Sequence, residues 1–189
     1  YVRGAITEEQ CMSYTEKLLG IPELIEKILE KPETCQFAAS RLVADEHLLY
    51  IGRGLDYALS MEGSLKLKEI SYIHSESYAA GELKHGTISL ITEDMPVIAV
   101  ATQRDVLDKT VSNIKEVKSR GAFTIVVTRE GTDFDKDVAD ILVTVPETDD
   151  LLMPMTAVVP LQLIAYYTAD LRGNDVDKPR NLAKSVTVE

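Results

Sequence analysis

The residues whose types and spacing suit proton transfer lie close together between positions 59 and 86. At 100° per residue, one sector of a helix over this stretch holds Glu62, Lys66, Glu69 and Ile73. Charged residues on such a helix have two interpretations. In the first interpretation, they form an ordinary surface network that stabilises the helix by roughly a few tenths of a kcal/mol per pair. Alternatively, a carboxylate and an ammonium are held in a cleft, where each tunes the other for proton transfer.

The other side of this helix and the residues that follow it also contain polar groups. Its opposite side holds Ser64, Lys68 and Ser71, which we expect to face solvent. After the helix, residues 75–81 are small and polar and predict a connecting segment. Next comes His85, which can gain and lose a proton near neutral pH. A single histidine in such a run is more often an ordinary surface residue.

Four segments carry a resemblance to a known family. Residues 62–70 read EGSLKLKEI, residues 74–76 read HSE, residues 81–86 read GELKHG, and the closing residues 177–189 read DKPRNLAKSVTVE. This set resembles the isomerase part of glucosamine-6-phosphate synthases, the glutamine:fructose-6-phosphate aminotransferase family. His74 lies within the second segment, but we assign it no catalytic role.

The resemblance implies a reaction and a role for each site residue. The reaction opens fructose 6-phosphate, adds ammonia at C2 and moves a proton between C1 and C2, without a metal or an organic cofactor. Glu69 matches the family's general base, and Lys66 would favour its ionised form and help to hold the sugar oxygens. His85 would open the sugar ring and would come from the other subunit of a homodimer. Lys184 would form a Schiff base with the sugar carbonyl, and Ala183 would contact the sugar through its backbone.

Composition narrows the classes of partner and compartment. The 189 residues include 20 basic and 31 acidic side chains, a net charge of −11, so nucleic acid and anionic membrane surfaces are poor partners. Residues 151–171 are apolar but contain Pro154 and Pro160, and we expect a buried helix rather than a membrane span. Cys11 and Cys35 have no metal-type spacing and predict free thiols in the cytoplasm. The start lacks Met and a signal segment, which suggests part of a longer protein.

The order of predicted elements gives the fold class. Residues 1–45 predict a helical linker, with a capped helix from Thr7. Residues 46–173 predict an α/β domain. Residues 174–189 are polar and lack clear periodicity, which is also typical of a frayed terminus, and it is the resemblance that implies a catalytic tail there. Apolar strands are expected in this domain at 47–51, 96–101, 122–128 and 141–145, and helices after residue 54, at 105–120 and at 152–171. Such alternation favours a three-layer sandwich with a parallel sheet flanked by helices.

The same fold is implied by the resemblance, whose architecture is that of sugar isomerase (SIS) domains. A Gly52-Arg53-Gly54 turn follows the first strand, but the third glycine of a dinucleotide site is missing. The family's glutaminase domain and its first SIS domain, which holds the phosphate, are also absent. We therefore expect both as partner domains of a full-length chain, and no activity from this chain alone. Two other functions stay open: a non-catalytic module that senses sugar phosphates, and a purely structural dimerisation domain.

Overall fold

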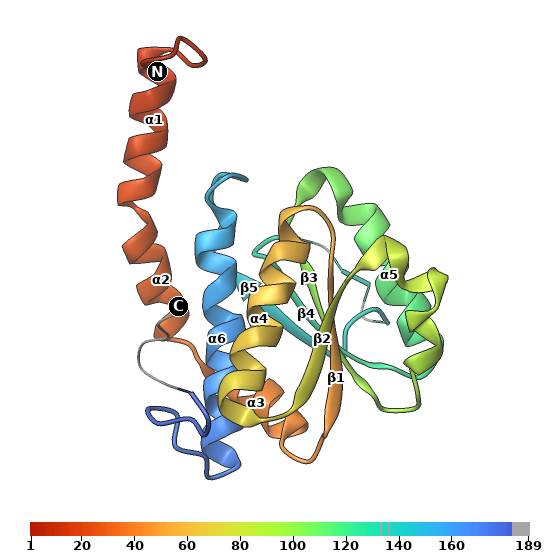
Figure 1. Cartoon of the computed structure of the whole chain (residues 1–189). Helices are drawn as coiled ribbons and strands as arrows, with labels where there is room; N and C mark the ends of the chain where they lie inside the picture. The colour runs from red at the N-terminus through yellow and green to blue at the C-terminus, as the bar shows by residue number, and fades with distance from the viewer. Residues whose placement is uncertain (133, 136, 183–189) are drawn as a thin grey trace, which may run out of the picture.

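Five parallel strands form the centre of the molecule (Figure 1). The computed structural model describes residues 1–132, 134–135 and 137–182. Across the sheet, the strands follow the order β2-β1-β3-β4-β5. Their bounds are β1 His47–Gly52, β2 His74–Ala79, β3 Pro96–Ala101, β4 Phe123–Arg129 and β5 Ile141–Val145.

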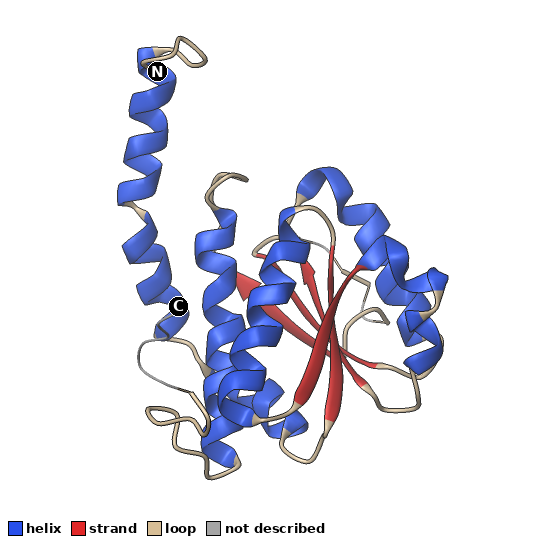
Figure 2. Ribbon diagram, viewed as in Figure 1, coloured by secondary structure: helices blue, strands red, loops and turns tan. Residues whose placement is uncertain are grey.

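Helices cover both faces of this sheet, as the predicted three-layer sandwich requires (Figure 2). The α-helices are α1 Glu8–Leu19, α2 Ile21–Leu29, α3 Glu33–Leu42, α4 Leu55–Ser71, α5 Leu107–Lys118 and α6 Met153–Leu171. The described residues also form short 3-10 helices: η1 Ala80–His85, η2 Thr87–Leu90 and η3 Arg104–Val106. One core joins the sheet to α3, α4 and α6, and a second core joins its other face to α5 and η1.

The N-terminal helices form as the sequence predicts. Thr7 accepts a hydrogen bond from the Gln10 backbone at 3.2 Å, and the Gln10 side chain accepts one from the Thr7 backbone at 2.9 Å. This reciprocal pair is a capping box and fixes the start of α1. No residue of α1 is buried, and the helix stands away from the sheet (Figure 2). By contrast, α2 buries Ile21 and Ile28.

The apolar runs read as strands are confirmed, and their burial explains the pattern. All six residues of β3 are buried, because helices cover both faces of the sheet at its centre. Edge strand β5 alternates instead: Ile141, Val143 and Val145 are buried, and the residues between them are exposed. Both strands have the predicted bounds, whereas β4 runs one residue later than predicted.

The segment after the Glu69 helix was predicted wrongly as a connection: it contains the edge strand β2. Its six residues pair in parallel with β1, from His47 opposite His74 to Gly52 opposite Ala79. Most of its side chains are only partly buried, so the polar composition typical of a loop is compatible here with a strand. The two exceptions are His74, which is exposed, and Ser75, which has no exposed surface.

Helix α4 corrects a second expectation, since Ser64 and Ser71 face the core rather than solvent. Ser64 is 1% exposed and Ser71 0%. The Ser64 and Ser75 hydroxyls lie 2.9 Å apart, and Ser71 donates to the Leu67 carbonyl at 2.7 Å. These bonds satisfy the hydroxyls, which therefore tolerate burial. The helix ends at Ser71, so Ile73 lies beyond it.

The turn between β1 and α4 explains the glycines that precede the helix. A Cβ at Gly52 would lie 2.4 Å from the Asp56 carbonyl oxygen, and Gly54 has a φ of +57°. Both positions therefore need glycine, as a tight approach of strand to helix predicts. This turn fixes the point at which α4 leaves the sheet, and with it the position of the charged residues on its outer side.

Candidate functional site

Lys66 and Glu69 form an ion pair on the outer side of α4. Lys66 Nζ lies 2.8 Å from Glu69 Oε2 and 3.8 Å from Glu62 Oε1. The hydrogen bond to Glu69 is the largest cause that raises the pKa of Lys66 above its ordinary value. The side chains of Lys66 and Glu69 are 35% and 28% exposed, so a ligand can still reach both. The structure thus brings together a carboxylate and an ammonium suited to proton transfer, with Glu62 as a weaker third member.

His85 lies elsewhere on the molecule, at the end of η1. Two residues of η1, Ala80 and Leu83, pack into the core that contains Ile114 and Val117 of α5. That core is on the opposite face of the sheet from α4 (Figure 1). The His85 side chain is 78% exposed, and its Nε2 lies 3.6 Å from Glu82 Oε2. Within one copy, the structure does not bring His85 to the Lys66–Glu69 pair.

The other two predicted site residues, Ala183 and Lys184, lie outside the described residues. The described part of the predicted tail follows α6 and reaches the end of α4. There, Asn174 Nδ2 donates to the Ile70 carbonyl at 3.0 Å, and the Arg180 backbone N–H donates to the Tyr72 hydroxyl at 2.9 Å. The tail therefore approaches the helix that carries Glu69.

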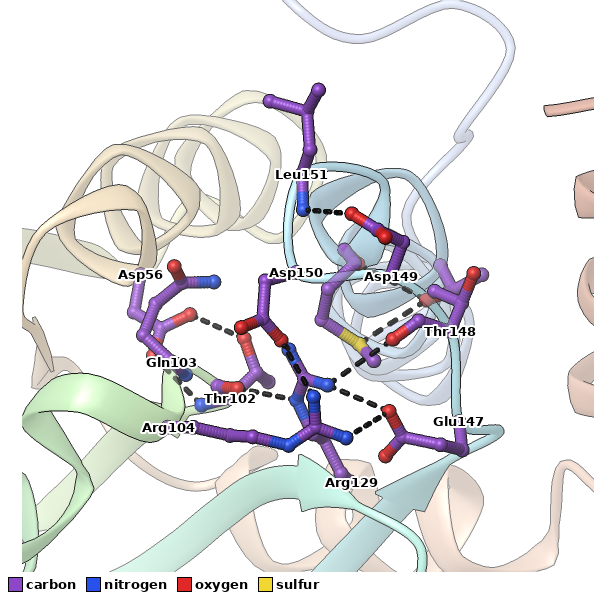
Figure 3. A network of polar contacts seen from close by, with 12 residues as sticks. Asp56, Thr102, Gln103, Arg104, Arg129, Glu147, Thr148, Asp149, Asp150 and Leu151 are labelled. Atoms are coloured by element: carbon purple, nitrogen blue, oxygen red, sulfur yellow. Dashed lines mark hydrogen bonds and ion pairs between the residues drawn. The ribbon is translucent and has the colours of Figure 1, made fainter. Parts of the chain in front are cut away.

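A charged network that the sequence did not predict occupies the carboxyl ends of the strands (Figure 3). Arg129, the last residue of β4, is 3% exposed. Its guanidinium donates to Glu147 at 2.7 Å and also to Asp150. Arg104 bonds the same two carboxylates from the solvent side, at 2.5 and 3.1 Å. Two arginines thus face two carboxylates, and the charges balance within the chain.

Asp56 forms the buried end of this region. Its carboxylate accepts hydrogen bonds from the Thr102 backbone at 2.7 Å, the Thr102 hydroxyl and the Gln103 backbone at 3.0 Å. Burial raises the pKa of Asp56, and these hydrogen bonds only partly oppose the rise. Parallel sheets commonly bind ligands at the carboxyl ends of their strands. Here the bonds from Thr102 and Gln103 to Asp56 join the segment after β3 to the start of α4, so they hold α4 in place.

Among the residues described, no group of three or more His, Cys, Asp or Glu side chains is arranged to hold a metal ion. His47 and His74 meet edge to face at the opposite end of β1 and β2, with ring centroids 5.6 Å apart. Cys11 and Cys35 are free thiols, as predicted, and burial raises the pKa of Cys35 to about 11. Over the same described part of the chain, every helix is too short or too polar to span a bilayer.

The comparisons with known proteins agree with this architecture. A family model for the SIS domain matches residues 41–171. Glutamine--fructose-6-phosphate aminotransferase [isomerizing] from Clostridium acetobutylicum is 50% identical over 187 residues, and that from Clostridium tetani is 52% identical over 188. Each alignment covers 99% of this chain but 31% of the relative. The chain therefore spans about a third of the length of the curated relatives it matches.

A comparison with solved structures finds the same aminotransferase family. The C-terminal domain of glucosamine-fructose-6-phosphate aminotransferase from Francisella tularensis superposes with a TM-score of 0.86 at 38% identity. That alignment covers 94% of this chain and 50% of the other. The predicted resemblance to the isomerase part of this aminotransferase family is confirmed. Since the family model covers well over half of the residues and the sheet has the matching architecture, the chain belongs to the SIS domain family.

Proposed function

We propose that this chain is the catalytic isomerase part of an enzyme that makes glucosamine 6-phosphate from fructose 6-phosphate and ammonia. The observation that carries the proposal is the Lys66–Glu69 pair, 2.8 Å apart on the outer side of α4. A carboxylate in this position can accept a proton from C1 or C2 of an open-chain sugar and return it to the neighbouring carbon. The names of the relatives supply the substrate class, a sugar phosphate.

Lys66 assists this transfer electrostatically. Its ammonium is held by two carboxylates, at 2.8 and 3.8 Å, and the raised pKa keeps it charged at neutral pH. A fixed positive charge stabilises negative charge that develops on the sugar oxygens during enolisation. An ammonium has three N–H donors, and the bond to Glu69 uses one, so the other two allow a bond to a sugar hydroxyl.

His85 acts, in this proposal, in the site of a second copy of the chain. What supports this arrangement is the separation within one copy: α4 and η1 lie on opposite faces of the sheet. His85 is also highly exposed and close to Glu82, so it is available to a neighbouring molecule. An imidazole can both donate and accept a proton, so it can move one between the ring oxygen and a hydroxyl, which opens the sugar. A homodimer of two-fold symmetry would build two such composite sites.

The tail supplies the remaining chemistry. We propose that Lys184 attacks the open-chain carbonyl and that the Ala183 backbone contacts the same sugar. Domain bounds of 1–45 for the linker, 46–173 for the SIS domain and 174–189 for the tail belong to this proposal. We also propose a cytoplasmic location. The full-length enzyme would contain two further domains, a glutaminase domain that releases ammonia and a first SIS domain that binds the phosphate. No turnover is expected from the 189 residues alone, because ammonia and the phosphate site come from elsewhere.

Subunit mixing tests the proposal in a full-length enzyme that contains this chain. Glu69→Gln should lower kcat by about 10²–10⁴-fold, as expected for loss of a general base. The matched control is Glu62→Gln, which removes the weaker partner of Lys66 and should change kcat less than about twofold. His85→Ala should also be inactive. Random exchange between Glu69→Gln and His85→Ala subunits makes mixed dimers half of the total, each with one intact site, so about a quarter of the activity should return.

Two outcomes would contradict this reasoning. If Glu69→Gln turned over like Glu62→Gln, the pair would be an ordinary surface network, and a non-catalytic sugar-phosphate module would be the better assignment. If mixed dimers were demonstrated by mass spectrometry and no activity returned, His85 would act in its own subunit. Each outcome removes a different part of the proposal.

A further inference from the structure

The segment that follows α6 is bound to the rest of the chain at its start. Arg172 Nη1 donates to the carbonyls of Val43 and Asp45, at 2.9 and 3.1 Å, just after α3. Asn174 Nδ2 donates to the carbonyls of Ile70 and Ser71, at 3.0 and 3.3 Å. The last carbonyls of a helix have no partner within the helix, so Asn174 satisfies two polar groups that α4 cannot satisfy itself.

A second attachment point lies six residues further along, at Arg180. Its backbone N–H donates to the Tyr72 hydroxyl at 2.9 Å, and its guanidinium lies 4.0 Å from the centre of the Tyr72 ring. A cation in this position is attracted by the face of an aromatic ring. Between the two points, the Asp175 carboxylate accepts from the backbones of Asp177 and Lys178, at 3.0 and 3.1 Å, and closes a turn. The segment from Arg172 to Arg180 therefore follows one fixed path.

Tyr72 is an unusual residue for its position. It ends α4 with a φ of +63° and a ψ of 15°, the left-handed region that favours glycine or asparagine. Neither the helix end nor the backbone calls for a tyrosine there. Its ring and hydroxyl are instead used by Arg180, from a segment more than a hundred residues later in the sequence.

We propose that Tyr72 is a positioning residue that anchors the C-terminal tail through Arg180 and so limits the region that Lys184, four residues later in the sequence, can reach. This inference rests on the proposed function for the role of Lys184. Tyr72 follows Glu69 by three residues, and Arg180 precedes Lys184 by four. Four residues span at most about 14 Å, so an anchor at Arg180 limits the region that Lys184 can search. Without it, the tail would have to be ordered from Asn174 onward at each turnover, over more than twice that length of chain.

The anchor itself is tested on this chain by amide hydrogen exchange, independently of catalysis. Tyr72→Asn removes the ring and the hydroxyl and leaves a residue that accepts the left-handed backbone, so the fold should be retained. Tyr72→Phe keeps the ring and removes the hydroxyl. Each of the two contacts is worth roughly a factor of five in a docking equilibrium. Amides of residues 175–182 should exchange at least about tenfold faster in Tyr72→Asn, with an intermediate effect in Tyr72→Phe.

The control substitution is Lys178→Ala, which changes an exposed side chain of the same segment. It should leave these exchange rates within about twofold of the parent. Equal exchange in the parent and in Tyr72→Asn would overturn the anchor. A loss of protection throughout the sheet would also count against it, because the effect would then be one of global stability rather than of the tail.

The consequence for Lys184 is tested in the full-length enzyme by borohydride trapping with fructose 6-phosphate. Tyr72→Asn should reduce both kcat and the rate of covalent labelling at Lys184 by about tenfold, while KM changes little. Tyr72→Phe should restore part of both. If the parent enzyme were not labelled at Lys184, the proposed function and the delivery of this lysine would both fall, whereas the exchange result would still decide the anchor. If Lys184 were labelled equally fast in Tyr72→Asn and in the parent, the positioning role alone would be refuted.

Discussion

At Gly63, α4 packs closely against Tyr50 of β1 and Leu161 of α6, so Gly63→Ala is a direct test of how this helix is positioned. In an isolated helix the substitution would be favourable by about 1 kcal/mol, because alanine loses less backbone freedom than glycine. In this fold, the added Cβ would lie 2.9 Å from Tyr50 Cε1 and 3.1 Å from Leu161 Cδ1. Both neighbours are completely buried and cannot turn aside. Overpacking of this kind costs about 1–3 kcal/mol.

The two effects oppose each other, and we expect the steric cost to exceed the gain. Gly63→Ala should lower the free energy of unfolding by about 1–2 kcal/mol, measured by urea titration with far-UV circular dichroism. Gly20→Ala is the matched control: its backbone is already helical at φ −82°, and the nearest atom to an added Cβ is 3.4 Å away. This control should be neutral or stabilising by up to about 1 kcal/mol. If Gly63→Ala unfolded at the same or a higher urea concentration than the parent, the close approach of α4 to β1 and α6 would be wrong.

Four further substitutions test other parts of the structure. Tyr50→Phe removes a buried hydroxyl that has no partner among the described residues, so unfolding should cost about 1 kcal/mol more in a urea titration. Burial raises the pKa of Asp140, but the bond from Lys118 contributes to a net lowering, so Asp140→Asn should cost about 1–2 kcal/mol at neutral pH. In acid titrations that difference should disappear as the pH falls below 3.8 through the lowered pKa. Arg129→Met removes the buried partner of two half-exposed carboxylates that Arg104 still binds, and leaves the Thr102 and Thr148 carbonyls without their donor, so it should lower the unfolding free energy by about 1–3 kcal/mol. In the full-length enzyme, Lys184→Arg should abolish both activity and the borohydride adduct with fructose 6-phosphate, and an adduct spread over other lysines would contradict the assignment.

The central strands could be predicted from the sequence because their burial leaves a simple pattern. Residues 96–101 are apolar at every position, and the structure covers both faces of that strand. The start of α1 could also be predicted, because Thr7 and Gln10 have the spacing of a capping box. The Lys66–Glu69 pair followed from helical spacing alone. In each case the partners are close in sequence, so local geometry determines the contact.

The errors have a common physical origin in groups whose partners are distant. β2 reads as a loop because an edge strand can keep polar side chains, and its pairing with β1 is invisible locally. Ser64 reads as a solvent-facing residue because its partner, Ser75, belongs to that unrecognised strand. The Arg129 network depends on the order of strands in the sheet, which brings residue 129 to residues 102, 147 and 150. An arginine that ends an otherwise apolar strand was the available sequence signal.

The charged network at the strand ends has a consequence for where chemistry can take place in this fold. A phosphate at the carboxyl ends of β3 and β4 would need free positive charge, but the Arg129 guanidinium is already paired with Glu147 and Asp150. An anion would have to displace two carboxylates from a nearly buried arginine, which costs more than a surface contact returns. The same region holds α4 through Asp56, whose carboxylate binds the end of β3. The bonds at the strand ends thus hold α4 in place, and the outer side of this helix carries the Lys66–Glu69 pair, where we propose that the tail and a second copy of the chain supply the remaining groups.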